Sequence, residues 1–184
     1  MQNWHEAQVD NLTTGLLNEF DYLLKQVREN NDTIYGVVIC VDSDILTGYL
    51  ALGTVQTNAK KEKQYADWDC KWVPGEWEIA TETNEIDNGV VSLFLNEMRR
   101  HYVEEIEPKF KDNFDYTEER EKNLWLFMTG FRKAKEILQQ KYKAELKDAL
   151  FYLSIPGDEV FEKETATKLN EPSDLLTEMI MENA

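Results

Sequence analysis

This chain of 184 residues has few cysteines, histidines and prolines: it holds two cysteines, two histidines and four prolines. Two cysteines do not form the disulfide framework of a small secreted domain. Cys40 lies in an apolar, strand-like run, where a thiol usually packs as a small hydrophobic side chain. Cys70 lies between Asp69 and Lys71, and nothing nearby activates its thiolate.

Sequence motifs typical of metal and cofactor binding are also absent. The chain has no zinc-type spacing of cysteine and histidine, no Gly-rich phosphate loop and no dinucleotide fingerprint. We therefore predict neither a metal nor a cofactor.

Long hydrophobic runs and an excess of basic residues are absent as well. No apolar run reaches the roughly 18–20 residues that span a bilayer, and the first residues lack the basic start and apolar core of a signal peptide. The chain carries 36 acidic and 20 basic residues, a formal net charge of −16. This charge disfavours nucleic acid and membranes as partners, because both are bound through Lys and Arg, and it attracts a basic protein. We expect a cytoplasmic protein.

The first part of the sequence predicts one helix and two strands. Apolar residues recur every three or four positions over residues 5–29, which indicates an amphipathic helix. Residues 33–42 are β-branched and apolar on both faces, as in a central strand. After a turn at Asp42-Ser43-Asp44, residues 46–57 are predicted to form a second strand. The short link makes this strand antiparallel to the first.

The middle of the sequence predicts a solvated turn and two long helices. The turn lies at the basic run 60–63, Lys-Lys-Glu-Lys. One helix begins near Asn88 and stops at Pro108, and the next begins with Thr117 as its N-cap.

The last part of the sequence predicts a third strand at residues 149–155, a loose acidic stretch, and a final helix over residues 174–182 capped by Ser173. These elements describe one α+β domain over residues 1–184, in which several long helices pack with a mostly antiparallel sheet. Residues 172–184 form its C-terminal helix and tail.

The segment Trp72-Val73-Pro74-Gly75-Glu76-Trp77-Glu78 is the most informative stretch of the chain. Pro presets one turn residue and Gly permits the other, so a chain reversal is predicted here. The reversal would aim Trp72 and Trp77 at a common surface, with Glu76 and Glu78 beside them. In an alternative interpretation, Trp77 packs in the core and both glutamates are solvated.

The order of these parts resembles the bacterial domain-of-unknown-function family numbered 4303. The resemblance covers the chain from about residue 10 to about residue 180. It rests on the first strand with its acidic end, the small-residue strand Tyr49–Thr54, the string Trp-x-Pro-x-Glu-Trp-Glu, the two long helices and the late strand. A run of three acids is common after the family's first strand, whereas here Ser43 interrupts it.

The family resemblance implies no established activity. Its looser association is with bacterial immunity-type proteins, including α+β modules of the SUKH kind, which block the toxins of competing bacteria. The resemblance therefore implies a binding role.

Charge, motif and resemblance together lead to the hypothesis of a cytoplasmic, non-enzymatic binding protein of immunity type that neutralises a basic toxin or nuclease. The acidic surface would attract the partner, which would then dock around aromatic anchors. The expected anchors and charged contacts are Trp72, Trp77, Asp42, Asp44, Glu76 and Glu78.

A carboxylate-dependent enzyme, with or without a divalent metal, is the alternative from another class. Asp42-Ser43-Asp44 is similar to the Asp-x-Asp of haloacid dehalogenase-like phosphatases, although Thr47 comes one position late for that pattern. The same residues also suit a polar hairpin turn whose Asp side chains bind local N–H groups.

Two further carboxylate groupings stay open at this point. Glu76 and Glu78 could form an acid/base pair beside the tryptophans. Glu97, His101 and Glu105 are spaced to align on one helical face, as candidate metal ligands or as a charged surface stripe.

Overall fold

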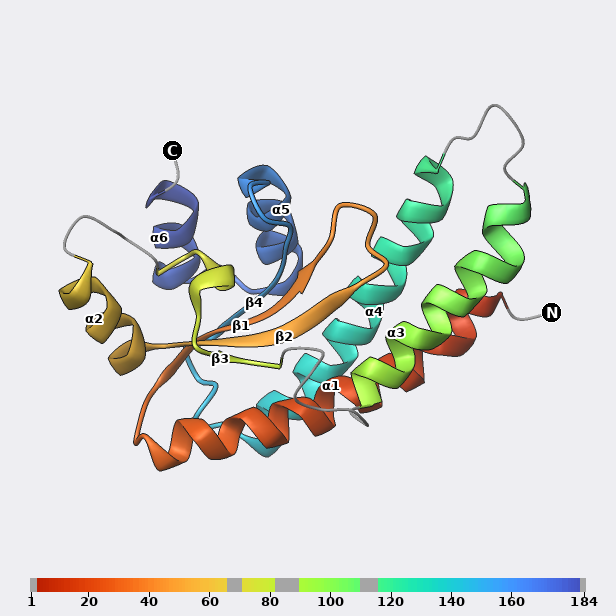
Figure 1. Ribbon diagram of the computed structural model, residues 1–184. Helices are drawn as coiled ribbons and strands as arrows, with labels where there is room; N and C mark the ends of the chain where they lie inside the picture. The colour runs from red at the N-terminus through yellow and green to blue at the C-terminus, as the bar shows by residue number, and fades with distance from the viewer. Residues whose placement is uncertain (1–2, 66–70, 82–89, 110–115, 183–184) are drawn as a thin grey trace.

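The computed structural model describes residues 3–65, 71–81, 90–109 and 116–182 (Figure 1). Within them a four-stranded sheet lies between two layers of helix. The lower layer contains α1 (Trp4–Glu29), α3 (Val90–His101) and α4 (Thr117–Lys141), and the upper layer contains α5 (Glu159–Leu169) and α6 (Asp174–Glu182). The predicted α+β class is confirmed.

The sheet has the strand order β3-β2-β1-β4. β1 (Ile34–Val41) pairs antiparallel with β2 (Gly48–Thr54), as the predicted hairpin requires, and β2 pairs antiparallel with β3 (Ile79–Ala80). β4 (Leu150–Ser154) lies parallel to β1. The sheet is therefore mixed, which corrects the expectation of a mostly antiparallel sheet. The long connection through α3 and α4 permits this parallel return, since parallel strands need a crossover of a dozen or more residues.

A β-bulge at Tyr35 sets which side chains of β1 face each layer. Between the pair made by Ile34 and the pair made by Gly36, β1 has one residue more than β2. Ile34 and Val37 therefore both face the lower core, and Tyr35 joins the upper core.

The lower core is the larger of the two. It joins the apolar stripe of α1, which confirms the predicted first helix, to α4 and to the lower face of the sheet. Its fully buried large side chains include Leu12, Leu16, Phe20, Leu23, Phe127, Phe131 and Phe151. Full burial of side chains of this size is worth roughly 1.5–3 kcal/mol each, so this core dominates the stability of the fold.

The ends of the lower helices differ from the prediction in detail. α4 begins at Thr117 with Tyr116 in the N-cap position, so the predicted N-cap is wrong by one residue. α3 continues through a π-helical turn (Tyr102–Ile106) into the 3₁₀ turn Glu107–Lys109, which contains Pro108. The predicted start at Asn88 lies outside the described residues, as does Cys70.

The second strand is shorter than predicted because a helix, α2 (Val55–Gln64), begins directly after it. Asp32 explains this start. Its carboxylate accepts hydrogen bonds from the N–H groups of Gln56 (2.8 Å) and Thr57 (3.0 Å), which satisfies the unpaired donors of the first turn. The basic run 60–63 is thus part of a helix, which corrects the predicted turn.

The acidic stretch after β4 forms helix α5, which corrects the loose segment expected there. Asp158 caps α5 by accepting a hydrogen bond from the N–H of Phe161 (3.0 Å). The predicted last helix is confirmed as α6, and the Ser173 hydroxyl caps it by accepting from the N–H of Leu176 (3.1 Å).

Side chains from the α5 region cover the outer edge of β4. Asn170 accepts a hydrogen bond from the N–H of Phe151 (3.0 Å) and donates to the Phe151 carbonyl (2.7 Å). The Thr165 hydroxyl accepts from the N–H of Leu153 (3.1 Å) and donates to the Leu153 carbonyl (2.9 Å). The edge groups that a further strand would use are therefore already paired.

Two glycines make room for Trp77 on the upper face of the sheet. Gly36 and Gly53 pair across β1 and β2. A Cβ on Gly36 would lie 2.6 Å from Trp77 Cη2, and one on Gly53 would lie 2.7 Å from Trp77 Cζ2. The indole therefore lies directly on the backbone of the sheet.

Substitution Gly36→Ala is expected to lower the free energy of unfolding by about 1–3 kcal/mol, the usual cost of overpacking a core. Gly75→Ala is the matched control, because a Cβ there meets nothing within 4 Å. Urea denaturation measures both. The cost of Gly36→Ala should shrink in a Trp77→Leu background, and an undiminished cost would contradict the indole as its cause.

No helix in the described parts of the chain is long and apolar enough to cross a membrane.

Candidate functional site

The Trp-Pro-Gly segment packs inward. Trp72 and Trp77 are only 4% and 9% exposed, and both contact Tyr35 edge-on in the upper core. Trp77 Nε1 donates to the carbonyl of Lys71 (3.2 Å). The predicted chain reversal exists as a 3₁₀ turn, Pro74–Glu76. The prediction that both tryptophans point to a common surface is wrong. The two glycines below Trp77 leave space in which its indole packs directly on the sheet. The alternative with Trp77 in the core is confirmed.

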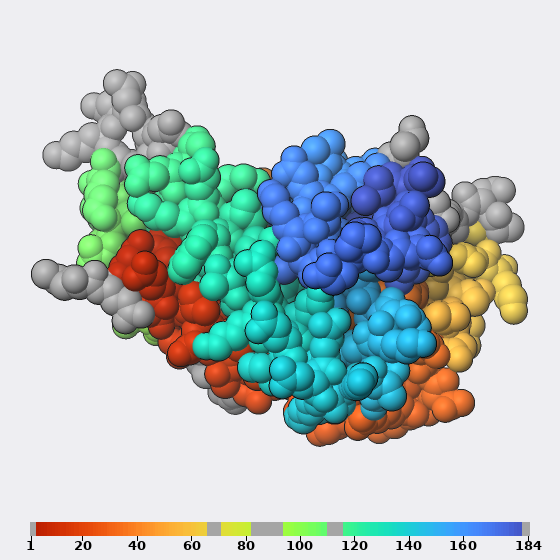
Figure 2. All heavy atoms as spheres, turned by 180° about the vertical axis from the view of Figure 1, so that it is seen from behind, coloured from red at the N-terminus to blue at the C-terminus, as the bar shows by residue number. Residues whose placement is uncertain are grey.

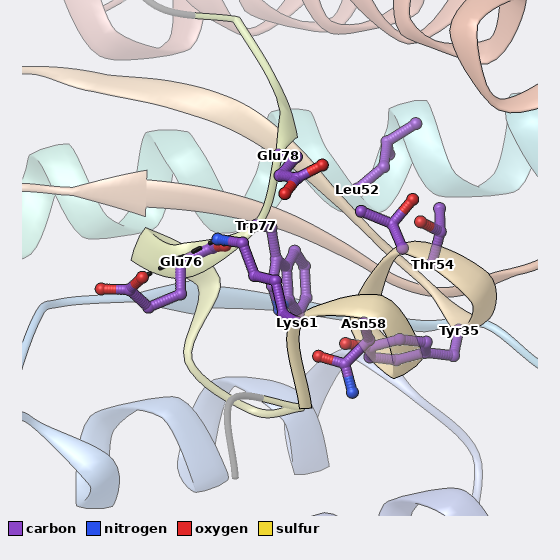
Figure 3. Close-up of a pocket in the computed structure, with 9 residues that line it drawn as sticks. Tyr35, Leu52, Thr54, Asn58, Lys61, Glu76, Trp77 and Glu78 are labelled. Atoms are coloured by element: carbon purple, nitrogen blue, oxygen red, sulfur yellow. Dashed lines mark hydrogen bonds and ion pairs between the residues drawn. The ribbon is translucent and has the colours of Figure 1, made fainter. Parts of the chain in front are cut away.

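Glu76 and Glu78 both line one small cavity, but their carboxylates do not converge. Figure 3 shows their carboxylates pointing in different directions, on either side of Trp77. The Lys61 ammonium donates to the backbone carbonyl of Glu76 and lies 3.8 Å from its Oε2. The cavity beside them has a volume of about 10 Å³, which holds about one water molecule. The cavity does not enclose a substrate-sized volume.

Asp42 shapes the turn between β1 and β2. Its carboxylate accepts hydrogen bonds from the N–H of Leu46 (2.8 Å) and the hydroxyl of Thr47 (2.9 Å). These bonds confirm the predicted polar hairpin turn. Ile45 adopts a φ of 55°, a left-handed conformation that is strained for a β-branched residue, and its side chain is fully buried. The turn is therefore held in one shape.

Helix α4 holds the same turn from the other side. The Tyr116 hydroxyl donates to the carbonyl of Asp44 (3.0 Å), and Arg120 Nε donates to the carbonyl of Ser43 (2.7 Å). Asn123 donates to the Tyr116 hydroxyl (3.0 Å) and lies 3.0 Å from His5 Nε2. A chain of hydrogen bonds thus connects the buried His5 of α1 to the turn.

The predicted stripe of Glu97, His101 and Glu105 is not one site. Glu97 pairs with Arg100 on the surface (2.5 Å), whereas His101 stacks on Trp4 with their ring centroids 4.0 Å apart. Burial lowers the pKa of His101, and Glu119, 3.9 Å away, opposes that effect. Among the described residues, no group of three His, Cys, Asp or Glu side chains is placed to hold a metal ion.

Asp42 and Asp44 lie at the edge of the sheet where the parallel strands β1 and β4 both end. Cys40 of β1 pairs with Ser154 of β4, so the two strands leave the sheet side by side. The chain after β4 brings further carboxylates to this edge. We define the acidic edge by the residues Asp42, Asp44, Asp158 and Glu159. The carboxyl ends of parallel strands are a common location for binding sites.

An exposed valine lies beside Glu159 of the acidic edge, and three of the edge carboxylates are not neutralised by ion pairs among the described residues. Val160 follows Glu159 directly and is 68% exposed. In the parts of the chain that the structure describes, no Lys or Arg forms an ion pair with Asp44, Asp158 or Glu159. Their negative charge is therefore available to a partner.

A buried carboxyl lies beneath the acidic edge. Glu162 is 6% exposed and accepts a hydrogen bond from the hydroxyl of Ser154. Burial raises the pKa of Glu162 to about 7; the bond from Ser154 opposes this rise, and the neighbouring Glu159 and Asp158 add to it. Burial also raises the pKa of Cys40 to about 12, so its thiol stays protonated, which agrees with its interpretation as a small buried side chain.

The predicted residues therefore fall into two groups. Glu78 precedes Ile79, which pairs with Leu52 of β2, and Leu52 in turn pairs with Val37 of β1. Val37 lies five residues from Asp42, a distance of roughly 17 Å along a strand. Glu76 and Glu78 are therefore separate from Asp42 and Asp44.

Asp158 and Glu159 were missed because their segment was predicted to be loose. Asp158 three residues before Phe161, with Ala166 and Leu169 following at helical spacing, is the signal that could have found the helix and its cap.

Comparison with known proteins decides the family. The family model described as Domain of unknown function (DUF4303) matches residues 12–170. The chain belongs to this family. No curated protein and no solved structure matches the chain. The DUF4303 match spans the sheet, most of α1, α2 to α5 and the acidic edge, whereas Trp4, His5 and α6 lie outside the matched residues.

Proposed function

We propose that this DUF4303 protein is a cytoplasmic, non-enzymatic module that binds a basic protein, acting as an immunity-type protein that occludes a toxin or nuclease. The observation that carries the proposal is the acidic edge, where the exposed Asp44, Asp158 and Glu159 form no ion pair among the described residues. Val160, which follows Glu159, is exposed as well. The formal net charge of −16 also favours a positively charged partner. A positive surface is the complement that such an edge would steer toward itself.

Binding would proceed in two stages. The overall negative charge raises the rate of encounter with a cationic protein. The acidic edge then makes the close contacts, with Val160 as an apolar contact that loses its water. The strained and hydrogen-bonded turn at Asp42 is already ordered, so little conformational entropy is lost when the partner docks.

The proposal changes the roles of the residues predicted from sequence. Asp42 and Asp44 stay in the binding site, Asp42 as the residue that shapes the turn. Trp72 and Trp77 support the fold from the upper core. Glu76 and Glu78 lie toward the other end of β1 and form a separate charged surface near α2.

Charge reversal of the acidic edge tests the proposal. The variant combines Asp44→Lys, Asp158→Lys and Glu159→Lys. The control combines Glu29→Lys, Glu104→Lys and Glu136→Lys, which are exposed positions outside the edge with the same change in net charge. Each immobilised protein is exposed to a lysate of the source organism and eluted along a salt gradient, and the released proteins are identified by mass spectrometry.

We expect the native protein and the control variant to retain the same discrete basic protein and to release it as salt rises, because salt screens exposed charges. The edge variant should not retain it. Equal losses in both variants, or equal retention by both, would contradict a binding site at the acidic edge.

A further inference from the structure

Trp125 is the tryptophan most open to solvent among those the structure describes. It projects from the outer face of α4 and is 46% exposed, unlike Trp72 and Trp77. Tryptophan is one of the residue types most enriched at binding hot spots. Trp125 is therefore a candidate anchor that the sequence pattern did not single out.

Trp125 borders a hollow between the first turn of α1 and the first half of α4. Figure 2 shows the beginning of α1 lying against this part of α4. The hollow has a volume of about 360 Å³ and is lined by Asn3, His5, Glu6, Glu118, Glu121, Lys122 and Trp125. This volume suits one long side chain better than a cofactor.

The hollow keeps an excess of negative charge. It contains three carboxylates and one ammonium group, and the ammonium of Lys122 is already paired with Glu118 at 2.7 Å. The hydrogen bond with Glu118 raises the pKa of Lys122. Glu6 accepts a hydrogen bond from the N–H of Asn3 (3.2 Å), and Glu121 is exposed beside the indole. Glu6 and Glu121 remain to balance an incoming cation.

We propose that this hollow receives the guanidinium group of an arginine side chain of the partner. The guanidinium plane would stack on the Trp125 indole, and its N–H groups would donate to the Glu121 carboxylate. Arginine fits better than lysine, because a planar, weakly hydrated cation stacks on an aromatic face and presents a fork of donors to a carboxylate. The inference rests on the proposed function and names the group that the basic partner inserts.

The hollow and the acidic edge lie on opposite sides of α4. Glu118, Glu121 and Trp125 follow each other at spacings of three and four and share one face of the helix. Tyr116 and Arg120, which hold the Asp42–Asp44 turn, lie on the other face. A helix is roughly 10–12 Å across, so a partner that contacts both sites must reach around the first half of α4.

Titration with N-acetyl-arginine amide tests the inference without the partner. N-acetyl-citrulline amide, which has the same shape and no charge, is the matched ligand. The indole N–H signal of Trp125 is followed by nitrogen–proton NMR and assigned by its loss in Trp125→Phe. We expect a saturable shift with the arginine compound, none with the citrulline compound, and a roughly threefold weaker affinity in Glu121→Gln, as one charge-assisted contact at an exposed site provides. Glu136→Gln, an exposed acid further along α4, should leave the affinity unchanged.

An equal shift by citrulline, no shift by arginine, or an unchanged affinity in Glu121→Gln would overturn the inference. Its failure differs from failure of the proposed function. If the arginine compound does not bind while charge reversal of the acidic edge still abolishes capture of the basic protein, only the arginine site is wrong. If the compound binds while capture is insensitive to the acidic edge, the hollow is an arginine site and the proposed binding site is wrong.

Discussion

Replacing Glu162 by glutamine is expected to raise the free energy of unfolding above pH 7 by about 3 kcal/mol and to leave it almost unchanged near pH 4.5. The pKa of Glu162 is about 7 in the folded protein, against an ordinary value of 4.5. Between these pH values the folded protein keeps a proton that the unfolded chain has released. The native protein therefore loses stability as pH rises from about 4.5 to 7, by about 1.4 kcal/mol for each pH unit of the shift. Glutamine has no proton to release and can still accept the hydrogen bond from Ser154.

Urea denaturation at several pH values between about 4.5 and 8 measures this effect. The matched control is Glu164→Gln, an exposed position on the same helix, which should follow the native pH profile. A Glu162→Gln variant whose stability falls with pH as steeply as that of the native protein would show that another group is responsible.

Replacing Asn170 by alanine is expected to lower the free energy of unfolding by about 2–4 kcal/mol. The substitution removes the partners of the Phe151 N–H (3.0 Å) and carbonyl (2.7 Å) and a bond to the Ala166 carbonyl (2.8 Å). Each buried polar group left without a partner costs about 1–3 kcal/mol. The variant also frees the N–H and carbonyl of Phe151 at the outer edge of β4 for pairing with a second molecule, while Thr165 still covers Leu153.

Two measurements separate these consequences. Urea denaturation gives the loss of stability, and sedimentation over a wide range of protein concentration detects association through the exposed edge. Asn11→Ala is the control, because that side chain bonds only to Gln8 on the surface of α1. A fully monomeric Asn170→Ala variant would argue that Asn170 plays no part in preventing association.

The helices and strands that could be predicted from sequence are those whose buried residues are apolar and recur at regular spacing. The helix over residues 5–29 and the strand over residues 33–42 show such patterns, and both exist. The apolar pattern of α5 is weaker, because two of the residues it buries, Glu162 and Thr165, are polar and bond to β4. Such burial depends on a partner strand, and periodicity within the helix does not reveal it.

The candidate site could be predicted only where its residues interact with close neighbours in the sequence. Asp42 shapes its own turn, and its bonds reach no further than Thr47. The acidic edge also needs Asp158 and Glu159, which reach it through the parallel pairing of β1 with β4. The burial of Trp77 depends on the glycines of two other segments. These relations join distant parts of the chain, and single-sequence patterns do not specify strand order.

The parallel pairing of β1 with β4 also constrains how the protein emerges from the ribosome. Gly36 pairs with Leu150, which lies 114 residues further along the chain. At a synthesis rate of roughly 5–20 residues per second, this partner is made about 6–23 s after β1. Its hairpin with β2 can form early, but one edge of the most apolar strand stays open during that time. A nascent chain with an open apolar strand edge depends on chaperones or on its own early helices for protection. Mutations that slow the arrival or docking of β4 should therefore lower the yield of folded protein in cells more than they lower its stability once folded.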